Sequence, residues 1–557
     1  MSKRPHDREK LDERPAKALR PDAVDRLSHL SDELLLRILS FLPTSTLSLC
    51  ERLSHKFYNI ASDSQLWKAA YYNRFVRPRA SRLPGMKDVG KSSDHLFYSS
   101  KLSKWLDEEH LIRRGQETNW KRQYKLRHNW SQGKCAVSEI AVSERPPVPP
   151  LLVRMHEGVI FTVDSISGLR AWSSKKDRGL ISCIELGKSA TQAAPPTSLA
   201  VDTSDQTRAS QRVVVGFKDG RYSVYELKPD SIGFVELYSH APSSNGSLSA
   251  IVYASPYLLT MTEGQLLSLY RFPTEPAKKC VTDILDPPRL LYSLRSHTVW
   301  PPLSLSIRPC SQSIIASIAY ALPTYLSGWS VGIQEMRLNL EGEIIESRLA
   351  TAANENFHSL VGKPSLSSPS TPPSLDPYFS GGSTWQRGQS SGSPTSLSYS
   401  HPYLLVSHSD NTLTLYLVNS STSSLSIGPG SRLWGHTSSV SGAHVGGRGK
   451  AVSVSCRGDE LRVWELEGGM ASSAARKRLV TGALSVRIQP EEDISSKPLD
   501  SLSDAISQRG SGLGLAPEHR FGDLSVTRGW VGFDEENVIF LREKSQGSQA
   551  LVVYDFT

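Results

Sequence analysis

Residues 27–75 read LSHLSDELLLRILSFLPTSTLSLCERLSHKFYNIASDSQLWKAAYYNRF, and their apolar residues recur at helical spacing. The first expected helix follows Ser31 and Asp32. Its apolar side chains cover roughly 220° of the helix circumference, at about 100° per residue. A surface helix needs a narrower apolar face to pack on its own domain. We therefore expect the remainder of this face to contact another protein.

Three further short helices are expected before residue 75. The breaks between them fall at residues that stop or cap helices, namely Pro43, then Thr44 or Ser45, then Ser54, then Asp63 or Ser64. A module of about 50 residues buries too little surface to be comfortably stable alone. Binding of a partner is therefore expected to complete its core.

This order of residues resembles the F-box, the module by which substrate receptors of Skp–cullin–F-box ubiquitin ligases bind the Skp adaptor. The resemblance rests on DELLLRILSFL at 32–42, ASDSQLWK at 61–68 and the apolar residues near them. Ser31 stands where the family has proline, and serine also starts helices well. The implied adaptor-binding residues are Leu30, Leu34, Leu35, Ile38, Leu39, Leu42, Pro43, Leu47, Leu53, Phe57, Leu66 and Trp67. The alternative is an ordinary helical mini-domain with a filled core.

From about residue 150 the pattern changes to short strands. The clearest unit, LWGHTSSVSGAHVGGRGKAVSVSCRGDELRVWEL at 433–466, resembles a WD-repeat blade with its Gly-His and Trp-Asp landmarks. In that family a His, an Asp, a Ser or Thr and a Trp form a buried hydrogen-bond chain. The resemblance gives these roles to His436, Asp459, Ser453 or Ser455, and Trp464. Asp459 stands one position nearer the Trp than usual, and Glu465 replaces the common Asp.

Weaker strand pairs recur along the chain, at 159–172, 213–227, 258–272, 314–338, 406–418 and 531–554. With the clear unit they make seven, which favours a closed β-propeller, because closure removes exposed sheet edges. Closure requires both ends of the domain in one blade. The strand-like LVVYDF at 551–556 and the segment 136–142 are the expected pair.

The expected fold is thus a small all-α F-box with a helical linker, followed by an all-β propeller of seven blades. The expected boundaries are a disordered tail at 1–26, the F-box at 27–75, the linker at 76–134 and the propeller at 135–557. A Ser/Pro/Gly-rich insertion at 359–400 is expected to be disordered, and 491–519 to be a polar insertion.

Most of the net charge of +9 lies in one segment, because 74–128 holds fourteen Lys and Arg against six Asp and Glu. No nucleic-acid motif accompanies the excess. The segment therefore reads as a solvated helical linker, with contact to an acidic partner as the alternative. Within it Trp120, Tyr124 and Arg127 recur at helical spacing, and a stiff linker would hold a bound substrate at a set distance from the catalytic partner.

No catalytic constellation or cofactor motif stands out in the chain. The six cysteines are scattered without CxxC spacing, which predicts no zinc site, no disulfide frame and a reducing compartment. The N-terminal residues do not form a secretory signal, and no apolar run is long enough to cross a bilayer. We expect a protein of the cytoplasm or nucleus, without catalytic residues, metal or cofactor, and with no membrane partner.

The expected function is that of a substrate-recognition subunit of a Skp–cullin–F-box ubiquitin ligase. The F-box would bind the Skp-type adaptor, and through it a cullin–RING ligase, while the propeller binds an unidentified protein substrate. Related receptors read phosphorylated peptides with arginines, for which Arg154, Arg170, Arg308 and Arg520 are candidates here. The alternatives are a scaffold that works without ubiquitin transfer, or a propeller protein that binds RNA or acidic surfaces through its basic linker.

Overall fold

The structure is a computed structural model, and its residues divide into two compact units, 1–124 and 125–557. The described residues are 27–76, 118–145, 147, 149–175, 178–186, 194–204, 210–228, 233–273, 285–295, 299–310, 313–324, 328–339, 341–352, 394–446, 449–466, 477, 485–490, 526–544 and 547–557. The expected tail at 1–26, most of the linker and the insertion at 491–519 lie outside them.

The first unit is helical. Its elements are α1 (Asp32–Leu39), α2 (Thr44–Cys50), α3 (His55–Ala61), α4 (Ser64–Tyr71) and the π-helix η1 (Tyr72–Val76). Ser54 and Asp63 cap α3 and α4 as expected, each accepting a hydrogen bond from a backbone N–H. The expected cap of α2 was wrong: Pro43 is the N-cap and Thr44 is already helical. The fixed φ of proline suits this entry to a helix.

Aromatic side chains form the core of this unit. The Trp67 indole N–H donates to the Ala61 carbonyl over 2.9 Å, and its ring lies edge-on to Tyr124 with centroids 5.5 Å apart. Tyr71 packs on Trp120 at the same centroid distance. Trp120 and Tyr124 belong to helix α7 (Trp120–Gln132), far along the chain from the F-box motif. The module therefore completes much of its core with residues of its own chain.

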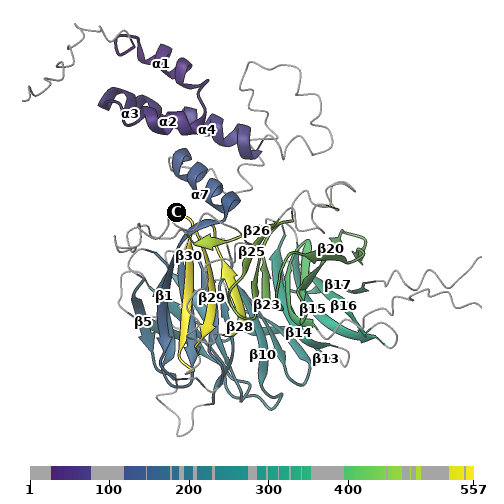
Figure 1. Ribbon diagram of the computed structural model, residues 1–557. Coiled ribbons are helices and arrows are strands. Elements are labelled where there is room, and N and C mark those ends of the chain that lie inside the picture. The colour runs from purple at the N-terminus through teal and green to yellow at the C-terminus, as the bar shows by residue number, and fades with distance from the viewer. Residues whose placement is uncertain are drawn as a thin grey trace, which may run out of the picture. The chain divides into compact units, whose positions relative to one another are not determined.

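After the end of α7 the second unit is built of strands, and its described strands form seven sheets (Figure 1). Blade 1 holds β2 (Leu152–His156), β3 (Val159–Asp164), β4 (Gly168–Ser173) and β5 (Leu180–Ile184). Blade 2 holds β6 (Pro196–Val201), β7 (Gln211–Phe217), β8 (Tyr222–Leu227) and β9 (Phe234–Ser239). Blade 3 holds β10 (Leu248–Ala254), β11 (Tyr257–Thr262), β12 (Leu266–Arg271) and β13 (Arg289–Arg295). Blade 4 holds β14 (Trp300–Pro309), β15 (Ile314–Thr324), β16 (Gly328–Leu338) and β17 (Ile344–Thr351).

The remaining three blades follow the same plan. Blade 5 holds β18 (Pro394–Ser400), β19 (Tyr403–His408), β20 (Thr412–Ser420), β21 (Leu425–Ile427) and β22 (Ser431–Trp434). Blade 6 holds β23 (Val440–Val445), β24 (Lys450–Ser455), β25 (Leu461–Glu465) and β26 (Ser485–Arg487). Blade 7 holds β28 (Val526–Phe533), β29 (Asn537–Glu543), β30 (Gln549–Asp555) and β1 (Lys134–Ser143), with the short β27 (Gln489–Pro490) parallel to β1.

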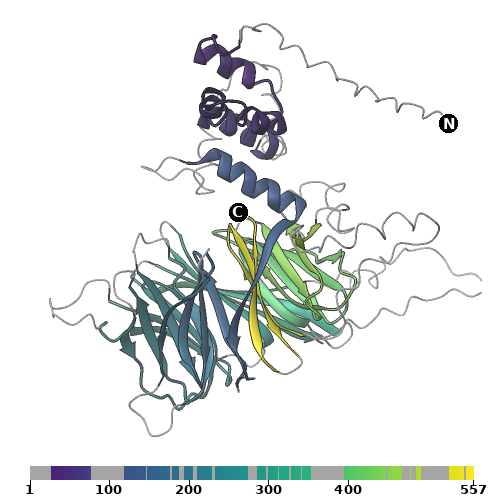
Figure 2. The ribbon, with the colours of Figure 1, turned by 60° about the vertical axis from the view of Figure 1, so that its left-hand side comes forward.

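The seven blades close into a ring, which confirms the seven-bladed expectation. The first strands of the blades contact one another in the order β2, β6, β10, β14, β18, β23, β28 and back to β2. Closure occurs where it was expected, because β1 pairs antiparallel with β30 from Ala136–Asp555 to Ser143–Gln549. Figure 2 shows this blue strand beside the yellow strands of the C-terminus.

The expected disorder through residue 400 was wrong at its end, because strand β18 covers Pro394–Ser400 and pairs with β19. Leu397 and Tyr399 alternate along it and enter the core. A serine-rich composition conceals this two-residue period, and the short serines fit beside a buried strand. The rest of the tract, residues 359–393, lies outside the described residues.

Blade closure generates a first prediction. Val553 is fully buried in β30, opposite Ser138 of β1 and Ile539 of β29. Val553→Asp places a carboxylate there without a partner and should lower the free energy of unfolding by at least ~3 kcal/mol. Urea unfolding followed by circular dichroism measures the loss. Ser244→Asp, at an exposed turn serine between β9 and β10, is the control and should unfold like the unmodified chain.

Candidate partner-binding surfaces

The apolar residues of α1 divide between two faces. Leu35 and Leu39 are almost fully buried in the core of the helical unit. Leu34 and Ile38 of α1, and Phe41 in the turn after it, follow the spacing i, i+4 and i+7 and are 55%, 42% and 72% exposed. The wide apolar arc seen in the sequence is thus two stripes, one for the protein's own core and one facing solvent.

Further exposed apolar side chains extend the set. Among the described residues, sixteen large hydrophobic side chains are exposed, and seven of them fall within 27–58. We call these seven the apolar F-box surface: Leu27, Leu34, Ile38, Phe41, Leu49, Leu53 and Tyr58. Such a concentration in a short segment is typical of a protein–protein contact.

The twelve residues expected to bind the adaptor are not equivalent in the structure. Leu34, Ile38, Pro43 and Leu53 are exposed, and Leu30, Leu42 and Phe57 are partly buried. Leu35, Leu39, Leu47, Leu66 and Trp67 are buried and support the surface from below. Four residues of this surface, Leu27, Phe41, Leu49 and Tyr58, were not among the twelve expected. Phe41 lies seven residues after Leu34 and Leu49 four before Leu53, and this helical spacing is a signal that could have found these two.

The entry to α1 is held by a lysine. Lys56 of α3 donates to the carbonyls of Ser28 and Leu30, over 2.8 and 2.9 Å, and lies 3.4 Å from the Asp32 carboxylate. These contacts fix the segment before α1 against α3. The backbone next to the apolar F-box surface is therefore already ordered before a partner binds. This order lowers the conformational entropy that is lost on binding.

Blade 6 contains a buried polar chain around Ser453. The His436 Nε2 lies 2.5 Å from the Ser453 hydroxyl, which also accepts the Trp464 indole N–H over 2.8 Å. The hydroxyl between His and Trp is thus Ser453, one of the two serines considered. Ser455 instead donates to Asp459 over 2.5 Å in the turn before β25. Ser455 and Asp459 are therefore not part of the hydrogen-bond chain that joins His436 to Trp464.

Glu460, which the sequence reasoning did not select, lies beside the other nitrogen of His436. Its Oε2 is 3.5 Å from His436 Nδ1 and accepts the Thr437 N–H and hydroxyl, while Oε1 accepts from Arg462. Burial would raise the pKa of Glu460, but these hydrogen bonds outweigh it and lower the pKa to about 2. The carboxylate expected at Asp459 is supplied one residue later, because Asp459 is taken up by its turn.

The comparisons with known proteins agree with this geometry. The family model described as F-box protein pof12 beta-propeller matches residues 135–557, and the F-box-like model matches residues 27–73. The chain belongs to this F-box propeller family. Its helical unit is an F-box, and the F-box and WD40-like families are typically non-catalytic.

One curated relative is the F-box protein dre-1 of Caenorhabditis elegans, which is 37% identical over 54 residues. The match covers 10% of this chain and only 6% of the nematode protein. Similar solved structures include the WD40 propeller domain of Doa1 (10% identity, TM-score 0.34, covering 75% of this chain and 96% of that one). The propeller domain of Cps50 (Swd1) from Myceliophteria thermophila has 12% identity and a TM-score of 0.37 and covers 76% and 100%.

The arginines considered for phosphate recognition have different surroundings. Arg170 is buried and donates to Asp164 over 2.7 Å and to the Val142 carbonyl, so it serves the structure of the propeller. Arg308 lies 3.8 Å from Glu335. Arg154, on the first strand of blade 1, is exposed, and Arg520 lies outside the described residues.

The pKa of His444 is affected by the surrounding protein and by the positive charge of Arg154. His444, on the first strand of blade 6, reaches solvent, yet the surrounding protein and the charge of Arg154 lower its pKa to about 4. His444 is thus neutral at physiological pH. Of the four arginines considered, only Arg154 combines exposure with a place on a first strand in the described part of the chain.

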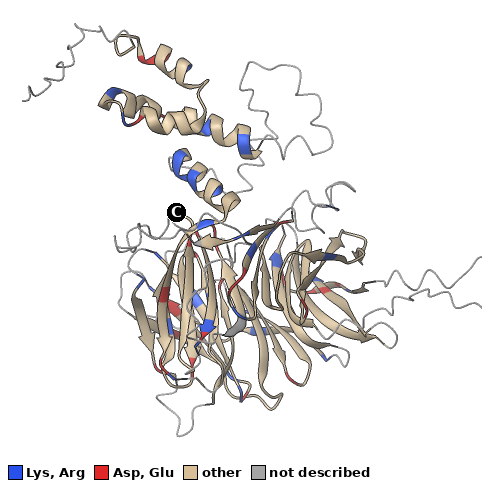
Figure 3. Cartoon of the chain, in the orientation of Figure 1, with Lys and Arg blue, Asp and Glu red and all other residues tan. Residues whose placement is uncertain are grey.

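The described residues show neither a metal centre nor a membrane span. No group of three or more His, Cys, Asp or Glu side chains in this part of the chain is placed to hold a metal ion. No described helix is long and apolar enough to cross a membrane. Of the basic segment 74–128, helix α7 carries Lys121, Arg122, Lys125 and Arg127. Figure 3 shows the blue of Lys and Arg along this helix.

The hydrogen-bond chain predicts that Ser453 matters more than Ser455. Ser453→Ala leaves the buried Trp464 indole N–H without its acceptor and removes the contact of His436, so it should cost about 2 kcal/mol or more. Ser455→Ala should lower the unfolding free energy less: it leaves the Glu460 N–H without the acceptor it has over 3.1 Å, but the other partner of Ser455, Asp459, is exposed and can bind water. Denaturant unfolding of both variants checks this order, and a larger loss in Ser455→Ala would contradict it.

Blade 6 also predicts a pH dependence. Burial lowers the pKa of His436 from 6.5 to about 4, so on acidification the unfolded chain takes up this proton first. Stability should be complete above pH 6.5 and fall towards pH 4, by at most ~1.4 kcal/mol per pH unit for this group. The slope of the unfolding free energy against pH reflects the number of protons taken up on unfolding. His436→Gln should reduce this slope by the contribution of one proton. An unchanged slope would show that His436 titrates normally.

Proposed function

We propose that this F-box protein is the substrate-recognition subunit of a Skp–cullin–F-box ubiquitin ligase. In this proposal the apolar F-box surface binds a Skp-type adaptor, segment 76–134 connects the domains, and the propeller from residue 135 binds the protein substrate. The chain itself would supply binding, and its partners the chemistry. Ligases of this class act in the cytoplasm and nucleus, where we expect this protein.

The exposed stripe of α1 carries the proposal. Leu34, Ile38 and Phe41 are open to solvent although buried residues already fill the core beside them. A soluble chain gains nothing in its own folding from such a stripe, whereas a partner that covers it gains apolar burial. The match of residues 27–73 to the F-box-like family supports an adaptor as this partner.

Charge substitutions on the exposed stripe test the adaptor contact. Leu34→Asp with Phe41→Asp should leave the fold intact, because neither side chain is buried. Burying two carboxylates against an apolar partner should weaken adaptor binding by at least about tenfold. Pull-down of the full chain with purified adaptor, followed by titration calorimetry, measures the change. Asn59→Asp, which adds one charge at an exposed position of α3, is the control.

Buried positions are unsuitable for this test. Trp67→Ala would remove a core ring and an indole hydrogen bond, so loss of binding would report only unfolding. If the folded Leu34→Asp, Phe41→Asp variant bound the adaptor normally, the proposed surface would be wrong. If the unmodified chain bound the adaptor but recruited no cullin from cells, the scaffold role would replace the ligase role.

A further inference from the structure

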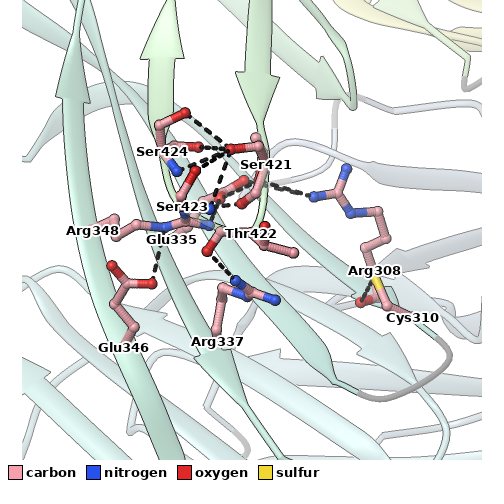
Figure 4. Close-up of polar contacts among 11 residues, drawn as sticks. Arg308, Cys310, Glu335, Arg337, Glu346, Arg348, Ser421, Thr422, Ser423 and Ser424 are labelled. Atoms are coloured by element: carbon pink, nitrogen blue, oxygen red, sulfur yellow. Dashed lines mark hydrogen bonds and ion pairs between the residues drawn. The ribbon is translucent and has the colours of Figure 1, made fainter.

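A serine-rich hairpin of blade 5 lies against arginines of blade 4 (Figure 4). The hairpin joins β20 to β21, and its tip reads Ser420-Ser421-Thr422-Ser423-Ser424. Arg337 Nη1 donates to the Thr422 carbonyl over 2.8 Å, and Arg348 Nη1 donates to the Ser421 carbonyl over 3.0 Å. Arg308 Nη2 lies 3.4 Å from the Ser420 hydroxyl. We call Arg308, Arg337 and Arg348 the arginine cluster.

The arginine cluster is only partly neutralised by carboxylates. The fully buried Glu335 lies 3.5 Å from Arg348 and 3.8 Å from Arg308, and Glu346 lies 3.7 Å from Arg348. Arg337 makes no ion pair with any described residue, and its buried Nε has no hydrogen-bond partner among them. The hairpin adds no acid, because residues 419–430 contain neither Asp nor Glu.

The arginine cluster thus donates hydrogen bonds to neutral backbone carbonyl oxygens. An anionic acceptor in the same place would bind the guanidinium groups more strongly. Hydrogen bonds from a guanidinium to a phosphate are charge-assisted and about twice as strong as those to a neutral acceptor. The groups best placed to carry such an anion are the hydroxyls of the hairpin itself. A phosphate attached to one of them would meet donors that already contact this backbone.

The local hydrogen bonds single out Thr422. The Ser420 hydroxyl donates to Glu335 over 2.7 Å, so a phosphate there would face a buried carboxylate. The Ser421 hydroxyl accepts the Ser423 and Ser424 N–H groups and so closes the turn. Thr422 is exposed, and no hydrogen bond to its hydroxyl occurs within the described part of the chain. Its carbonyl is the one that Arg337 binds.

We propose that Thr422 is a phosphorylation site, whose phosphate is bound by Arg337 and Arg348 and so fastens blade 5 to blade 4. The reaction requires a protein kinase with ATP: the Thr422 oxygen forms a bond to the γ-phosphorus, and the bond from that phosphorus to the bridging oxygen of ADP breaks. The hydroxyl proton passes to the kinase base. The hairpin offers access, because β21 is only three residues long and can open locally.

The consequence for the propeller is electrostatic. A phosphate at neutral pH carries close to two negative charges and offers three acceptor oxygens. It supplies the missing acid for Arg337 and adds acceptors for Arg348, whose side chain is more than nine-tenths buried. Strands β16 and β17 of blade 4 and the hairpin of blade 5 would then be linked by charge-assisted bonds in place of neutral ones.

The first experiment asks whether the modification occurs. The full chain is purified from the cells that naturally express it, with phosphatases inhibited, and its peptides are mapped by mass spectrometry. We expect phosphate on Thr422, and loss of that signal after phosphatase treatment. A fully covered hairpin peptide without phosphate on Thr422 would overturn the proposal, as would phosphate confined to the neighbouring serines.

The second experiment asks whether the arginine cluster binds the phosphate. Phosphothreonine is incorporated at position 422 of the full chain by a suppressor tRNA, and thermal unfolding is compared with the unmodified chain. The Tm should rise by about 2 °C or more, and the rise should disappear in Arg337→Gln. Arg337→Gln removes a donor to a backbone carbonyl near the surface, so the variant should fold.

A matched control distinguishes binding of the phosphate by Arg337 from the general effect of added negative charge on the Tm. Phosphoserine at position 244, an exposed turn serine between β9 and β10, should give no rise that depends on Arg337. An equal shift at position 422 with and without Arg337→Gln would overturn the capture by arginine. None of these measurements uses the adaptor or the F-box, so they stand apart from the proposed ligase function.

Discussion

The pairing of β1 with β30 is the constraint on which the propeller depends. Each blade buries the faces of its sheet against two neighbours, and the ring of first strands is complete only when blade 7 is complete. Blade 7 takes β1 from the start of the domain and β28 to β30 from its end. A sheet edge left open at this point would expose unpaired backbone groups and apolar side chains. The two ends of more than four hundred residues are thereby tied into one cooperative unit.

Within this ring, polar side chains mainly position strands. The chain from His436 through Ser453 to Trp464 spans three segments of blade 6, with every member buried. Glu335 does similar work between blades, because it accepts from Ser420 of blade 5 and lies near two arginines of blade 4. Buried charges need such partners, since an unpaired one is costly in an apolar interior. These groups make the scaffold rigid, and binding is left to the exposed surfaces.

The F-box unit solves a different problem, that of a small domain with a large apolar content. Its core borrows Trp120 and Tyr124 from α7, which pack on Tyr71 and Trp67. The Tyr124 hydroxyl accepts from Arg74 over 2.6 Å and lies 3.1 Å from the Thr44 hydroxyl, so this ring is also anchored by polar contacts. Because the chain supplies this part of the core, the exposed stripe of α1 is free for a partner. Stability and the proposed partner binding would therefore use different faces of this helix.

The sequence by itself determined the helical segments of the F-box, the seven strand pairs and the segments that close the ring. Those features follow from local periodicity, caps and turn residues, which act between neighbours in the chain. Only the tertiary structure decided that Ser453 and not Ser455 joins His436 to Trp464, and that Glu460 lies beside the histidine. It also decided that Leu35 is buried while Leu34 is exposed, and that Arg337 faces a serine-rich hairpin of the next blade. The physical reason is that burial and hydrogen-bond partners depend on which distant segments pack together, and no local pattern contains that information.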